Sequence, residues 1–186
     1  MKYILSTLLI FSLSVFADED YKYEPEGNPA EYYIGTFNRG KDLDDLVDWY
    51  EKFSDWAEDK GVYDDMGVAL LTPFFNADLT SIDVVWVNMF SNQTEQYAAL
   101  NAWMTQGGSK LMNSLPVTNS RQMNTYQWVI SNPSEAEDGD MMMAVYSDCK
   151  FEEGFDGRKV YDLYKDFAIY AQSQGCLLYT SPSPRD

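Results

Sequence analysis

The chain of 186 residues carries 30 acidic and 13 basic side chains, no histidine, and a net charge of −17. A field this negative excludes binding to nucleic acid or to an anionic membrane through general electrostatics, because both are polyanions. The absence of histidine also argues against a haem or zinc site that depends on imidazole ligands.

The N-terminus has the features of a secretory signal peptide. Lys2 is followed by an apolar run to Phe16, and Val15 and Ala17 occupy the −3 and −1 positions that a signal peptidase prefers. The run is too short to cross a bilayer, which takes about 20 residues; an N-terminal anchor is the alternative. We expect residues 1–17 to be removed and the protein to be periplasmic or secreted, without membrane association afterwards.

After a linker at 18–30, the elements of a first domain (31–131) follow from periodicity. Strands are predicted where aromatic and β-branched residues cluster or alternate, and helices where apolar residues recur at spacings of three and four. Gly107 and Gly108 interrupt the second helix, whose start carries a capping box at Asn92 and Glu95. The predicted elements are strand 31–37, helix 41–60, strand 66–72, strand 82–90, a helix over 92–115 and strand 123–130.

A linker at 132–140 precedes an internal repeat. Residues 32–61 fall without a gap on 146–175 when shifted by 114 positions. Nine positions are identical, and a spacing of this length corresponds to one small domain rather than to a solenoid repeat. We therefore expect 141–175 to begin a second, truncated copy, with a strand over 141–149 and a helix over 155–174. Asp42 and Asp156 are one of the nine identical pairs.

The element order is β-α-β-β-α-β, followed by β-α. This order predicts an α+β fold of the ferredoxin-like type, with a four-stranded antiparallel sheet and two helices on one face. The last eleven residues, 176–186, match the translation of a transposon-end sequencing adapter; a genuine Ser/Pro-rich tail is the alternative.

The element order, the tandem copy and the stretch from Val84 to Trp103, which includes Val-Val-Trp-Val-Asn-Met-Phe and Tyr97, resemble the dimeric α/β-barrel superfamily. The resemblance implies that two such domains pair, within or between chains, so that their sheets close into a barrel. The partner would be the missing second domain or a second chain. The superfamily includes small monooxygenases, haem-handling enzymes and stress-response proteins.

Four side chains on two strands are candidates for holding a planar ligand by stacking and one amide hydrogen bond: Trp86, Asn88, Tyr126 and Trp128. The simpler interpretation is that they are core and interface residues. The acidic group at 42–48 reads as a solvated helix face rather than a metal site. We expect no metal, no cofactor, and Cys149 paired with a cysteine in the missing region.

These observations favour an exported protein that binds a small ligand or acts in a stress response. The alternative is a cofactor-independent, monooxygenase-like enzyme acting on a small aromatic compound. A buried polar group with room beside it for a substrate would be the mark of an enzyme, and a filled apolar core would exclude one.

Overall fold

The computed structural model describes residues 21–74, 81–131 and 143–175. The chain forms a mixed α+β structure whose sheet has four strands in the order β2-β3-β1-β4, each antiparallel to its neighbours. This arrangement is compatible with the ferredoxin-like fold. The elements are β1 (Gly27–Phe37), α1 (Leu43–Glu58), β2 (Gly67–Leu71), β3 (Val84–Met89), α2 (Gln93–Thr105), the 3-10 helix η1 (Gly108–Ser114), β4 (Val117–Trp128) and α3 (Gly157–Ser173).

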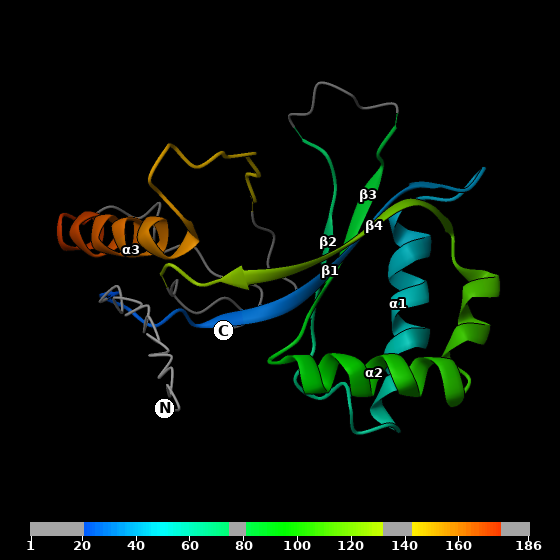
Figure 1. Ribbon diagram of the computed structural model, residues 1–186. Coiled ribbons are helices and arrows are strands. Elements are labelled where there is room, and N and C mark those ends of the chain that lie inside the picture. The colour runs from blue at the N-terminus through cyan, green and yellow to red at the C-terminus, as the bar shows by residue number, and fades with distance from the viewer. Residues whose placement is uncertain (1–20, 75–80, 132–142, 176–186) are drawn as a thin grey trace, which may run out of the picture.

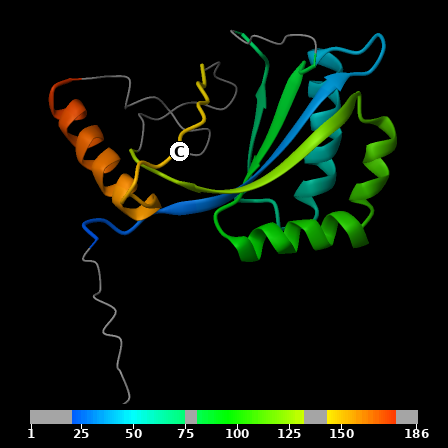
Figure 2. The same cartoon turned by 45° about the horizontal axis from the view of Figure 1, so that its top comes forward.

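Helices α1 and α2 cover one face of the sheet, and α3 lies at the far end of the long β1–β4 ribbon (Figures 1 and 2). Asp42 is the N-cap of helix α1, and its carboxylate accepts from the backbone N–H groups of Asp44 and Asp45 in a capping box. Its buried stripe packs on the sheet because apolar residues at helical spacing form one face. The buried members of this core are Leu46, Trp49, Phe53, Ala57, Val84 and Val117.

The break after α2 has a local cause. Gly107 adopts a φ of +92°, a left-handed conformation that favours glycine. A Cβ on Gly108 would lie 2.5 Å from the Trp103 ring and 2.7 Å from the Trp56 ring, so only glycine lets η1 approach these indoles. The predicted interruption is therefore confirmed, and it turns η1 across the end of the helical layer.

The opposite face of the sheet is also apolar. Val87 and Met89 of β3 are buried there, beside Ala30 and Tyr32 of β1. The Tyr32 ring meets the Tyr146 ring edge to face, with centroids 6.1 Å apart. Side chains therefore alternate along β3, with Trp86 and Asn88 facing the helices and Val87 facing away.

Two strands differ in extent from the prediction. β1 begins at Gly27, because residues 27–30 pair with the end of β4. β4 begins at Val117, six residues before the predicted start at 123, and pairs with β1 along its length. The sequence did not indicate this first half as a strand because it is polar and shows no apolar alternation.

The prediction of a strand over 141–149 is wrong for residues 143–149, which the structure describes. Residues 143–150 form no strand and are exposed. A strand needs a neighbour to pair its N–H and C=O groups, and none of the four described strands pairs with this segment. The helix expected after it does form, as α3, with Asp156 as its N-cap. Of the strand and helix expected over 141–175, only the helix is present in the described residues.

Candidate functional site

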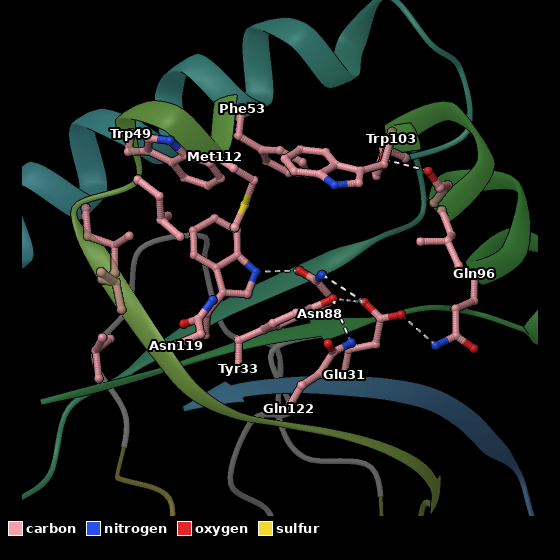
Figure 3. A pocket seen from close by; sticks show the side chains of 18 of the residues that line it. Glu31, Tyr33, Trp49, Phe53, Asn88, Gln96, Trp103, Met112, Asn119 and Gln122 are labelled. Carbon is pink, nitrogen blue, oxygen red and sulfur yellow. Dashed lines mark hydrogen bonds between the residues drawn. The ribbon is translucent and has the colours of Figure 1, made fainter. Parts of the chain in front are cut away.

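A cavity of about 320 Å³ lies between the helix-covered face of the sheet and the layer formed by α1, α2 and η1 (Figure 3). This volume is at the small end of the roughly 300–1,000 Å³ typical of ligand pockets. Its lining combines aromatic and aliphatic side chains with a few polar groups: Glu31, Tyr33, Leu46, Trp49, Phe53, Tyr63, Val84, Trp86, Asn88, Phe90, Gln96, Ala99, Leu100, Trp103, Met112, Leu115, Val117, Asn119 and Gln122.

The aromatic wall is centred on Phe53 of α1. Its ring lies edge to face with Trp86 of β3, at a centroid distance of 5.9 Å, and tilted against Trp103 of α2 at 6.0 Å. Trp49 meets Trp86 edge to face at 5.5 Å and donates its indole N–H to the Leu111 carbonyl at 3.0 Å. Such edge-to-face pairs are the favoured arrangement of aromatic rings, so the wall is built from mutually supporting rings.

The polar side of the cavity follows from strand register. Tyr33 lies opposite Trp86 and Glu31 opposite Asn88 in the antiparallel pairing of β1 with β3. Because side chains alternate along a strand, all four project to the same face. The sheet therefore presents one carboxyl, one amide and one phenol to the space beneath the helices.

Glu31 is the centre of this polar group and is only 8% exposed. Its Oε2 accepts from the Tyr33 hydroxyl at 3.0 Å and from Asn88 Nδ2 at 3.2 Å, and its Oε1 accepts from Gln96 Nε2 at 2.9 Å. Asn88 in turn accepts from the Trp86 indole N–H at 2.5 Å. Figure 3 shows this chain of contacts running along the cavity.

The two phenols near Glu31 keep their protons. Burial raises the pKa of Tyr33 well above its ordinary value, and the nearby Glu31 carboxylate raises it further. Burial and the same carboxylate also raise the pKa of Tyr63, which donates to the Ala99 carbonyl at 2.8 Å. Tyr33 is therefore a hydrogen-bond donor to Glu31, not a base.

The cavity opens where its lining is exposed. Leu100 and Met112 are 45% and 48% exposed, and Asn119 and Gln122 of the edge strand β4 are also exposed. These side chains lie on the rim between β4, α2 and η1. A small molecule could enter there without the sheet and α1 separating.

The structure brings together two of the four residues predicted to hold a ligand. Trp86 and Asn88 line the cavity. Tyr126 is 58% exposed, and Trp128 packs on Tyr161 of α3 at a centroid distance of 5.6 Å, at the other end of the β1–β4 ribbon. Neither of these two belongs to the lining.

Sequence reasoning missed Glu31. The signal available was its position in a strand of aromatic and aliphatic residues, two places before Tyr33 and hence on the same face. A carboxylate in that setting must either face water or find hydrogen-bond donors, and here it has three.

Cys149 is an exposed free thiol in the described part of the chain. Within residues 21–74, 81–131 and 143–175, no three His, Cys, Asp or Glu side chains gather as metal ligands would. None of the helices in these ranges is long and apolar enough to cross a bilayer.

No protein-family model matches the chain, and no curated protein matches it. The evidence for a function therefore comes from the cavity and the residues that line it.

Proposed function

We propose that this protein binds a small ring-containing molecule in the cavity between the sheet and α1, α2 and η1. The observation that carries the proposal is an unfilled space of about 320 Å³ with aromatic walls and a buried, hydrogen-bonded carboxylate at its side. A space of this size, edged by polar groups in fixed positions, is typical of a ligand site.

Filling the cavity from α2 tests the proposal. Ala99 lines the cavity and is buried, whereas Asn101 on the same helix is exposed and does not line it. We expect the unmodified chain and Asn101→Phe to bind members of a panel of neutral one- and two-ring aromatics in isothermal titration, and Ala99→Phe to lose at least about tenfold in affinity. Equal binding by Ala99→Phe, or no saturable binding by the unmodified chain, would contradict the proposal.

A second candidate function has its own supporting observation. Glu31 is a buried carboxylate with open space beside it, which is what a proton-abstracting enzyme requires. A cofactor-independent oxygenase acting on a small aromatic would use Glu31 as the base. Mass spectrometry of bound aromatics incubated in air, without added cofactor, separates the two: an oxygenated product that disappears in Glu31→Gln supports the enzyme, and unchanged compound supports a binder.

We also propose that α3 belongs to a second ferredoxin-like copy, in an exported protein of the dimeric α/β-barrel type. Two equivalences support this. Asp42 and Asp156 are both N-caps, and Gly40 and Gly154, two residues earlier in each copy, have φ values of +75° and +85°. The same local structure therefore begins both helices.

The exposed face of α3 supports the same proposal. In α1, Trp49 and Phe53 are buried against the sheet. Their counterparts at the 114-residue spacing, Leu163 and Phe167, are 55% and 50% exposed. An apolar face of this kind is normally covered, and the remainder of the second domain, or a second chain, would supply the cover.

A further inference from the structure

The Glu31 carboxylate is buried, and none of the described residues places a cation on it. Three described hydrogen bonds reach its oxygens, from the Tyr33 hydroxyl and from the Asn88 and Gln96 amide N–H groups. Its three partners, Tyr33, Asn88 and Gln96, are uncharged. Among the described residues, the three ion pairs involve Lys22, Lys41 and Arg158, and none reaches Glu31.

Glu31 is also the only charged side chain among the described residues that line the cavity. Removing a carboxylate from water costs several kcal/mol unless an opposite charge or good hydrogen bonds compensate it. The neutral donors supply part of this compensation. The excess of acidic over basic residues in the whole chain adds a negative field, and no described lysine or arginine forms an ion pair with Glu31.

The rest of the wall suits the same type of ligand. The faces and edges of Trp49, Phe53, Trp86 and Trp103 surround the space beside the carboxylate. Aromatic faces attract organic cations through the ring quadrupole, most strongly for tryptophan. A hard metal ion is a poor match, because Ca²⁺ takes six to eight oxygen ligands and this cavity offers one carboxylate among indoles and aliphatic side chains.

We propose that the ligand of this cavity is an organic ammonium: a ring that fills the aromatic part, carrying a protonated nitrogen that pairs with Glu31. This inference rests on the proposed binding function and narrows its ligand class. Asn88 and Gln96 orient the carboxylate. Because Tyr33 and Asn88 donate to Oε2 and Gln96 donates to Oε1, a second lone pair of Oε1 is left for the ligand.

A matched pair of probes separates charge from shape. Tryptamine carries an ammonium at about pH 7, because alkyl amines titrate near the lysine value of about 10.4; tryptophol has the same ring and chain with a neutral hydroxyl. In isothermal titration of the full chain at low salt, tryptamine should bind at least about tenfold more tightly than tryptophol. Equal or tighter binding of tryptophol would overturn the ammonium inference and leave the binding function intact.

Saturation by neither probe would count against the binding function and the ammonium inference together. The variant Glu31→Gln keeps the size of the side chain and removes its charge. It should bring tryptamine to within about threefold of tryptophol. Glu51→Gln, on the exposed side of α1 and outside the cavity, is the matched control and should keep the preference. The comparison of probes on the unmodified chain decides the question even if Glu31→Gln does not fold.

Discussion

The contact between Asn88 and Glu31 makes a sharp prediction about charge in the site. Asn88→Asp keeps an acceptor for the Trp86 indole but places a second carboxyl where Nδ2 now lies, 3.2 Å from Glu31 Oε2. At that separation, two ionised carboxylates would repel by about 5 kcal/mol at an effective dielectric constant of about 20. The pair avoids this cost by keeping one proton, which then bridges the two groups.

Holding that proton has a cost that depends on pH. In the unfolded chain both carboxyls titrate near their ordinary pKa of about 4, whereas the folded pair retains a proton above that pH. The folded state therefore binds more protons, and stability falls as pH rises, by about 1.4 kcal/mol per unit. We expect Asn88→Asp to destabilise the protein by about 1–2 kcal/mol at about pH 5 and about 4 kcal/mol at about pH 7.

Urea unfolding followed by tryptophan fluorescence at several pH values measures this loss relative to the unmodified chain. Asn101→Asp, on the exposed face of α2, is the control and should show little change with pH. A loss in Asn88→Asp that is the same at pH 5 and pH 7, or that is below about 1 kcal/mol at both, would mean that the two side chains do not meet as described.

Three further predictions concern the core, the opposite sheet face and α3. Phe53→Ala should lower the free energy of unfolding in urea by about 3–5 kcal/mol, because the Phe53 ring contacts both Trp86 and Trp103. Phe53→Leu should lower it much less. A loss below about 1 kcal/mol in Phe53→Ala would contradict this packing. Burial, together with the neighbouring Tyr146, raises the pKa of Tyr32 to about 12. The folded state therefore keeps the Tyr32 proton to higher pH than the unfolded chain, so the stability that Tyr32 adds is fully present below about pH 10 and is lost toward about pH 12. Tyr32→Phe should flatten the alkaline fall in unfolding free energy, and an unchanged fall would refute the assignment. A chain of residues 18–175 should self-associate in analytical ultracentrifugation, and the double change Leu163→Glu and Phe167→Glu should reduce this self-association. If residues 18–175 without these changes sediment as a monomer, the apolar face of α3 is not a surface that packs against another domain or chain.

The order of elements in the first domain could be predicted because each element carries its own periodic signal. The alternation along the strand predicted over 82–90 puts Trp86 and Asn88 on one face of the sheet, but the sequence leaves open which face the helices cover. On α1, Val47 has the same apolar spacing as Phe53 and is nevertheless 41% exposed, because a stripe gives the side of a helix that packs but not the edge of the contact.

The cavity could not be predicted, since it depends on how far the helices stand from the sheet. Glu31 illustrates the difficulty: its three donors come from β1, β3 and α2, and no local pattern shows that these meet. Trp128 was predicted to hold the ligand but lies outside the cavity. It shares the aromatic character of Trp86, but the long β1–β4 ribbon carries it to α3.

The segment 143–149 resembles β1 in sequence but forms no strand. Helix α3 formed as predicted because its capping and its periodicity are local. A strand depends on a partner that is remote in sequence, and the similarity to β1 brings no such partner with it.

A small ring compound that binds in the cavity beside Glu31 must lie against the indoles that line it. The most direct test records the indole N–H signals of the five tryptophans by ¹⁵N-edited NMR while tryptamine is added. Three tryptophans line the cavity, Trp49, Trp86 and Trp103, while Trp128 packs against α3. We predict that the three lining signals shift to saturation and that the Trp128 signal stays in place; shifts centred on Trp128, or no shift in any lining signal, would contradict the account.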